Sequence, residues 1–187
     1  MSDLRAQFVE GMNRALTFVA VATTDGEAGR YGVTISSLTS VSADGDHPSL
    51  LACIHHLSPA ATAILKNRAF CANLLGEGQQ GLSDLLAGRD KSGTKKSGGD
   101  KSGGDKSGGD KPGLADRFDR AAWHRGEVGQ PVLAGATAAF ECRLATAVLW
   151  ETHYIIVGKV VSVTLSDDPS ALLYGQRAYR KAVQLPD

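Results

Sequence analysis

Hydroxyl side chains gather in one short segment of the chain, which reads TISSLTS over residues 34–40. Serine and threonine hydroxyls both donate and accept hydrogen bonds, and an extended segment adds its backbone amides. We therefore expect Thr34, Ser36 and Ser37 to form a polar wall for a heteroaromatic ligand that carries many acceptors. An edge strand with one solvated face would give the same pattern, and composition alone does not separate the two interpretations.

A second candidate site is the junction between an apolar run and a helix start, CIHHLSP over residues 53–59. Ser58 is a favoured N-cap residue, and Pro59 suits the first position of a helix. The free amides of a helix start and a hydroxyl attract phosphate, although simple capping explains the same residues. His55 and His56 are adjacent, so on a strand they point to opposite faces, and we expect no metal site there.

His153 stands alone among apolar residues near a predicted hairpin. It is either a polar contact for a cofactor or substrate at the mouth of a barrel, or a rim residue that serves packing. The chain shows no nucleophile–histidine–acid order, no paired acids, and neither the GxGxxG nor the GxxxxGK[ST] phosphate motif. The residues alone therefore do not choose a reaction.

Composition excludes several classes of protein. The 187 residues hold 20 Lys+Arg and 20 Asp+Glu, so we expect no nucleic-acid binding by charge alone. No apolar run approaches the roughly 20 residues of a membrane helix, and the start MSDLRAQF lacks the apolar part of a signal peptide, so no membrane partner is expected. The three cysteines form no CxxC pair, which favours a reducing cytoplasm.

The elements that must position the candidate residues are mostly strands. Apolar and β-branched runs predict strands over 17–24, 33–41, 49–54, 70–75, 136–150 and 152–166, and the last two form a hairpin joined near Trp150-Glu151. Helical spacing and capping signals predict helices over 4–15, 60–67 and 81–88, while 119–131 reads as a loop. This pattern favours a mainly β fold, a β-barrel with peripheral helices.

Residues 90–111 break the pattern with a tandem KSGGD repeat that has no apolar side chain. Such a segment cannot bury enough apolar surface to offset its ordering entropy. We expect it to be a flexible surface insert within one domain that spans residues 1–187.

Five sequence blocks, taken in order, resemble the short-chain flavin reductases, a family with an FMN-binding split barrel. This family includes the reductase components of two-component flavin monooxygenases. The blocks are TTDGEAGRYGVTISSLTSVS (23–42), PSLLACIHHLSPAATAILKNRAFCANLL (48–75), DRF…W…G…GQPVLAGATAAFECR (116–143), HYIIVGKV (153–160) and LLY…Y (172–179). The resemblance covers nearly the whole chain except the repeat.

The resemblance implies a role for each candidate residue. Thr34, Ser36 and Ser37 would line the flavin ring, and Cys53 and Ile54 would offer it backbone contacts. Ser58 and the helix start after it would hold the flavin phosphate. His55 would belong to the same cofactor site, although His55-His56 stand where Asn-Arg is common in the family. His153, as the catalytic-site histidine, and Tyr179 would contact the nicotinamide dinucleotide.

The function that the resemblance implies is an NAD(P)H:flavin oxidoreductase. A hydride would pass from NADH or NADPH to FMN or FAD, in a homodimer that supplies reduced flavin to a partner monooxygenase. Orientation of the two rings, rather than a covalent nucleophile, would supply much of the acceleration. Two alternatives stay open: a reductase that keeps its flavin and reduces a corrinoid or metal chelate, and a flavin-binding carrier without catalysis.

Overall fold

A computed structural model describes residues 2–89 and 117–184 of the chain. The helices are α1 (Ser2–Arg14), α2 (Pro59–Asn67) and α3 (Gln80–Leu86), with a 3-10 turn, η1 (Glu77–Gln79), before α3. The strands are β1 (Thr17–Phe18), β2 (Ala20–Thr24), β3 (Tyr31–Ile35), β4 (Leu38–Ser42), β5 (Ser49–His55), β6 (Ala69–Leu74), β7 (Trp123–Arg125), β8 (Pro131–Leu133), β9 (Ala138–Trp150), β10 (His153–Leu165), β11 (Leu172–Gly175) and β12 (Ala178–Lys181). The KSGGD repeat lies outside the described residues.

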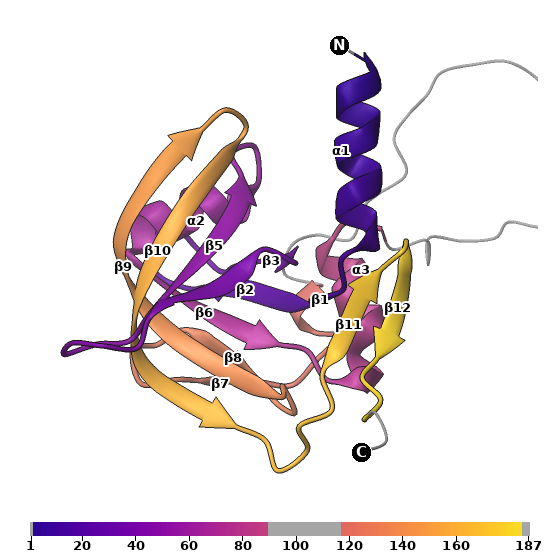
Figure 1. Cartoon of the computed structure of the whole chain (residues 1–187). Helices are drawn as coiled ribbons and strands as arrows, with labels where there is room; N and C mark the ends of the chain where they lie inside the picture. The colour runs from indigo at the N-terminus through magenta and orange to yellow at the C-terminus, as the bar shows by residue number, and fades with distance from the viewer. Residues whose placement is uncertain (1, 90–116, 185–187) are drawn as a thin grey trace, which may run out of the picture.

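The main sheet is antiparallel and has the strand order β3-β2-β6-β9-β10-β5-β4. Its two edge strands, β3 and β4, are consecutive along the chain and are joined through Ser36 and Ser37 alone. The sheet therefore curls until its edges meet at this link, which makes a barrel (Figure 1). The prediction of one strand over 33–41 is wrong in this respect, because Ser36-Ser37 ends one edge and begins the other.

The barrel interior is filled from one face of each strand. Along β5, Leu50, Ala52 and Ile54 are buried, while Cys53 and His55 point to the other face. This alternation follows from the two-residue repeat of a strand. The mainly β prediction is confirmed, as are the long hairpin β9–β10 and the helix after Ser58.

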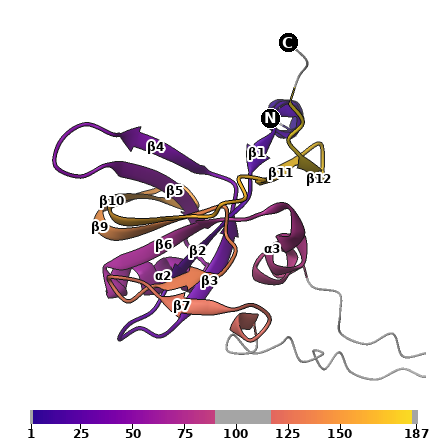
Figure 2. The ribbon, with the colours of Figure 1, turned by 90° about the horizontal axis from the view of Figure 1, so that it is seen from below.

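Helix α3 and strands β11 and β12 lie on one side of the barrel, as Figure 2 shows. β1, β11 and β12 form a small sheet of their own. The predicted loop 119–131 is wrong in part, because Trp123–Arg125 forms a strand that pairs with β8. Short strands of this kind carry little periodicity, so the sequence pattern does not show them.

Helix α1 extends away from the barrel (Figure 1). Its apolar side chains lie in solvent, with Leu4 74%, Phe8 66% and Met12 56% exposed. The helix therefore forms where it was predicted, but its apolar stripe covers none of the barrel core. In the described part of the chain, no helix combines the length and the apolar content that a membrane crossing requires.

Candidate functional site

The predicted hydroxyl wall borders a cavity of about 330 Å³ on the outer side of β5. The cavity is lined by Val33, Thr34, Ile35, Ser36, Ser37, Cys53, Ile54, His55, Ser58 and His153. The structure thus brings together every residue that sequence reasoning assigned to a cofactor site, except Tyr179. They come from the β3–β4 link, the end of β5, the start of α2 and the start of β10.

Ser37 ties the barrel edge to β5. The Cys53 amide donates to Ser37 Oγ over 3.1 Å, and the Ser37 hydroxyl donates to the Cys53 carbonyl over 2.9 Å. Because backbone groups alternate in direction along an antiparallel strand, Ile54 faces β10, where it pairs with Tyr154. The backbone groups of Cys53 and Ile54 are therefore engaged within the protein, and a ligand would have to share them.

Thr34 and Ser36 differ in how their hydroxyls are used. The Thr34 hydroxyl donates to the carbonyl of Ser83 in α3 over 2.7 Å, which fixes β3 against that helix. The Ser36 hydroxyl has no hydrogen-bond partner among the described residues, and its side chain is exposed. Ser36 is thus the member of the wall with its full hydrogen-bonding capacity available.

Ser58 occupies the N-cap position of α2, with Pro59 following it in the helix. Its backbone is extended, but its side chain makes no capping hydrogen bond. The amide of Ser58 donates to the His55 carbonyl over 2.9 Å, which turns the chain from β5 into the helix. Ser58 therefore lines the cavity with a hydroxyl that lacks the usual capping bond, at a helix start, an arrangement suited to an anionic oxygen.

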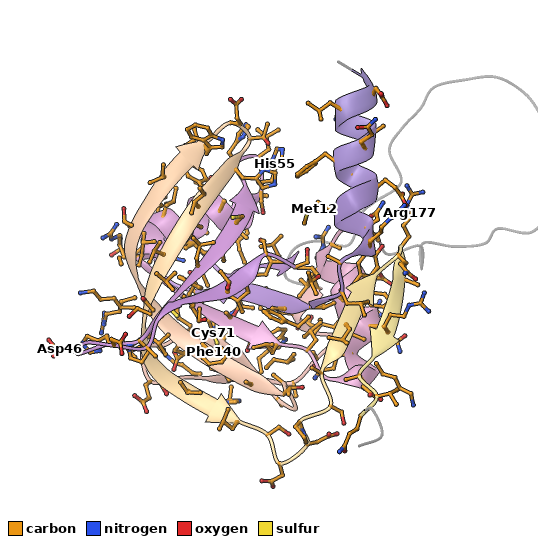
Figure 3. The ribbon with its side chains drawn as sticks, viewed as in Figure 1. Met12, Asp46, His55, Cys71, Phe140 and Arg177 are labelled. Carbon is orange, nitrogen blue, oxygen red and sulfur yellow. The ribbon has the colours of Figure 1, made fainter. Side chains whose placement is uncertain are left out.

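Three imidazoles meet at the end of this cavity. His55 and His153 are partners across the β5–β10 ladder, with ring centroids 5.0 Å apart at 76°. His55 also stacks on His56, with centroids 4.9 Å apart at 21°. The expectation that the two side chains point to opposite faces is therefore wrong, because β5 ends at His55. Figure 3 shows His55 at the end of β5, on the side toward α1.

Tyr179 lies elsewhere, in a neighbouring hollow of about 120 Å³. The two hollows share Thr34, Ile35 and Ser36, so the β3–β4 link stands between Tyr179 and His153. The Tyr179 hydroxyl donates to Asp84 Oδ1 over 2.7 Å. Burial raises the pKa of Tyr179 above its ordinary value, and the Asp84 carboxylate adds to this. The structure does not bring Tyr179 and His153 into one cavity.

A buried polar network escaped the sequence analysis. Glu141 of β9 is 3% exposed and accepts hydrogen bonds from the amides of Glu127, Val128 and Gln130. A single glutamate inside the apolar run 136–150 was the signal that could have revealed it. Glu141 holds the turn between β7 and β8 against the barrel rather than facing the cavity. Burial and the nearby Glu141 carboxylate raise the pKa of the Cys142 thiol to about 12.

The cavity suits an aromatic ring with polar edges. Val33 supplies apolar contact area beside the buried Ile35 and Ile54, while Ser36, His55 and Ser58 supply hydrogen bonds. Ligand sites commonly combine an apolar lining with a few placed polar groups. A phosphorylated flavin has this chemistry, since its ring carries acceptors and its phosphate needs donors. Within 2–89 and 117–184, no three His, Cys, Asp or Glu side chains converge as a metal site would require.

Comparisons with known proteins give the family. The family model described as a flavin reductase like domain matches residues 12–182. FMN reductase (NADH) RutF 1 of Methylorubrum extorquens is 33% identical over 181 residues, which are 97% of this chain and 78% of the relative.

Solved structures agree with this family. A protein of Haemophilus somnus described as a flavin reductase is 29% identical, with a TM-score of 0.77 over 95% of this chain and 98% of that one. BorF, the flavin reductase component of a bacterial two-component tryptophan halogenase, is 28% identical, with a TM-score of 0.73 over 98% of this chain and 99% of BorF. The chain belongs to the flavin reductase like domain family.

Proposed function

We propose that this protein is an NADH-dependent flavin reductase that takes FMN as its flavin. The observation that carries the proposal is the convergence of the hydroxyl wall, the Ser58 helix start and His153 on one cavity. Relatives named FMN reductase (NADH) support both the donor and the flavin. The chain covers 78% of the length of such a relative, so the likeness extends over most of its fold.

The chain's own residues would bind and orient the reactants. Ser36 and Ser37 would contact the edge of the ring, and Ser58 with the start of α2 would hold the phosphate. His153, the first residue of β10, would position the nicotinamide, since its side chain is exposed and lines the cavity. A bound flavin supplies the ring that accepts the hydride. Holding two rings in a reactive arrangement is worth a large part of the barrier, so no covalent nucleophile is needed.

Delivery of reduced flavin to a separate oxygenase fits the same picture. BorF, at 28% identity, is the reductase component of a two-component halogenase. We expect this chain likewise to release its product to a flavin-dependent partner. The cytoplasmic location stays a prediction from the sequence.

A homodimer is the expected assembly. On the outer face of β9, Val148 is 53% exposed and Trp150 is 69% exposed, beside the half-buried Ile155 of β10. An apolar strip of this kind on an otherwise polar surface marks an interaction site. The strip adjoins His153, so a second copy would cover the cavity side. Light scattering at micromolar concentration should give twice the chain mass, and a monomeric mass would reject the dimer.

The deciding experiment follows NADH absorbance, without oxygen, after FMN is added to the purified protein. Turnover of many FMN molecules per protein supports the reductase. If the protein keeps its flavin, and is therefore yellow, and oxidises NADH only when a corrinoid or a metal chelate is added, it is a bound-flavin reductase instead. Flavin binding with no NADH oxidation would leave a carrier. If the protein neither binds flavin nor oxidises NADH, its likeness to the flavin reductases would be one of fold alone.

A further inference from the structure

The three histidines beside the cavity differ in which ring nitrogen is already bonded. The Leu57 amide donates to His55 Nδ1 over 3.1 Å. A nitrogen that accepts a hydrogen bond carries no proton, so the proton of neutral His55 sits on Nε2. A positive charge on His55 would place a second proton against the Leu57 amide. The backbone therefore holds His55 as a neutral ring that donates from Nε2.

His56 and His153 are bonded in the opposite sense. His56 Nδ1 lies 3.0 Å from the Thr152 carbonyl, which can only accept, so Nδ1 carries the proton. His153 Nδ1 lies 2.9 Å from the Thr152 hydroxyl, which can accept as well as donate. Both rings keep these bonds when they become positively charged. Of the two, only His153 lines the cavity.

Few other ionisable groups surround this cluster. Among the described lining residues, only Cys53, His55 and His153 carry an ionisable side chain. Tyr154 packs against the barrel core, Glu151 in the turn before β10 is exposed, and the first turn of α2 holds no acid. No lysine or arginine of the described chain lines the cavity, so imidazole is the lining side chain that can add a positive charge beside an anionic ligand group.

We propose that the histidines divide two tasks: His55 is a permanent neutral hydrogen-bond donor, and His153 takes up a proton when a phosphate group occupies the cavity. The phosphate could belong to the flavin or to the dinucleotide, since both present the same chemistry. A protonated imidazole is cationic, so binding of the phosphate is then coupled to the uptake of a proton. This inference rests on the proposed function for the identity of its ligands.

The first test needs no ligand. Long-range proton–nitrogen NMR on protein with ¹⁵N-labelled histidine reports the tautomer of each ring. We expect the neutral ring of His55 to show a protonated Nε2 and a bare Nδ1. Assignment uses His55→Asn and His153→Asn, whose signals disappear in turn. A protonated Nδ1 on His55, or a His55 that gains charge before His153, would overturn the proposal.

The second test measures dissociation constants against pH for FMN, riboflavin and ADP-ribose. The range begins above about pH 7, where a phosphate monoester already carries nearly its full charge. A one-proton linkage weakens binding by at most about tenfold per pH unit. We expect this loss for FMN but not riboflavin if the flavin supplies the phosphate, and for ADP-ribose if the dinucleotide does. A pH dependence absent from both phosphate ligands, or equal in riboflavin, would overturn the proposal.

Variants separate the two histidines. His153→Asn should remove the pH dependence, whereas His55→Asn should weaken binding about equally at every pH and keep it. The matched control is His124→Asn, an exposed histidine of β7 outside the cavity lining, which should change neither. If no flavin or dinucleotide binds at any pH, the proposed function fails, while the NMR result still decides the tautomers.

Discussion

Two polar regions of this molecule use their hydrogen-bonding side chains in opposite ways. Behind the barrel, Glu141 and Asn73 are 3% and 0% exposed, and each makes several hydrogen bonds to neighbouring backbone. At the cavity, Ser36 and Ser58 are accessible and hold hydroxyls without an internal partner in the described chain. Buried polar groups need hydrogen-bond partners within the protein, whereas accessible ones can bond to water and then to a ligand. The difference separates residues that hold the fold from residues that leave hydroxyls accessible at the cavity.

Removing the carboxylate of Glu141 should have the largest effect. Glu141→Ala leaves three inward-facing amides without an acceptor, and each such loss costs about 1–3 kcal/mol. Urea denaturation should show a fall of about 3 kcal/mol or more in the free energy of unfolding. Glu127→Ala is the control, because that side chain is exposed in the same turn and should change little. A small loss of stability in Glu141→Ala would show that Glu141 does not have this structural role.

Packing within the barrel should come next. A methyl group at Gly158 would lie 2.7 Å from Phe70 Cζ and 2.8 Å from Cys142 Cβ, so Gly158→Ala must displace the core. We expect a loss of about 2 kcal/mol in urea denaturation, typical of an overpacked interior. Gly11→Ala in α1 meets nothing within 4 Å and serves as the control. Equal stability of the two variants would contradict the packing described here.

The buried thiols of Cys71 and Cys142 should make the free energy of unfolding fall at alkaline pH. Burial raises the pKa of Cys142 from 9.0 to about 12 and raises that of Cys71 as well, so the folded state holds these protons more tightly. Their stabilisation is full below about pH 9 and is lost as pH rises toward about 12. For each of the two thiols, we expect the free energy of unfolding to fall by about 1–2 kcal/mol between about pH 8 and about pH 10. In Cys142→Ala, the free energy of unfolding should decline less steeply with pH. An unchanged slope would show that the Cys142 thiol does not cause the decline.

The sequence predicts where the strands lie along the chain better than it predicts which segments they contact. Strand β5, the hairpin β9–β10 and helix α2 carry strong local patterns, so their positions follow from the chain alone. The break at Ser36-Ser37 does not, because its meaning depends on the two edges of the sheet meeting there. The partners of Glu141 are similarly invisible, since they are backbone amides supplied by a turn that folds over it.

The sequence pointed to residues that line one cavity, apart from Tyr179, but not to how these residues are bonded. Hydroxyls on an otherwise apolar strand and the Ser-Pro helix start identify Ser36 and Ser58. Local spacing does not show that Thr34 is engaged by α3, or that Tyr179 lies in a separate hollow. Such facts depend on tertiary packing between segments far apart in the chain.

Ser58→Ala should affect binding and leave the fold intact. Its hydroxyl makes no capping bond, so the usual cost of about 1 kcal/mol for losing an N-cap should not appear. FMN affinity should fall about tenfold, equivalent to about 1.4 kcal/mol, while riboflavin affinity stays the same. Fluorescence titration and thermal unfolding measure the two effects. A loss of stability without a loss of FMN affinity would assign Ser58 to the fold instead.

His153→Ala should have the smallest effect. We expect kcat/KM for NADH to fall about fivefold, equivalent to about 1 kcal/mol, because a positioning contact is lost rather than the reacting group. The exposed His47→Ala is the control. An unchanged kcat/KM would remove His153 from the nicotinamide site.

The most direct test of the site itself is hydrogen exchange of backbone amides with and without FMN. If the accessible polar groups mark the ligand site, FMN should slow exchange over residues 33–37 and 53–61. The network around Glu141 should exchange slowly in both states, because it is already closed. Slowed exchange confined to β11 and β12, with the cavity segments unchanged, would contradict the account and move the flavin to the hollow beside Tyr179.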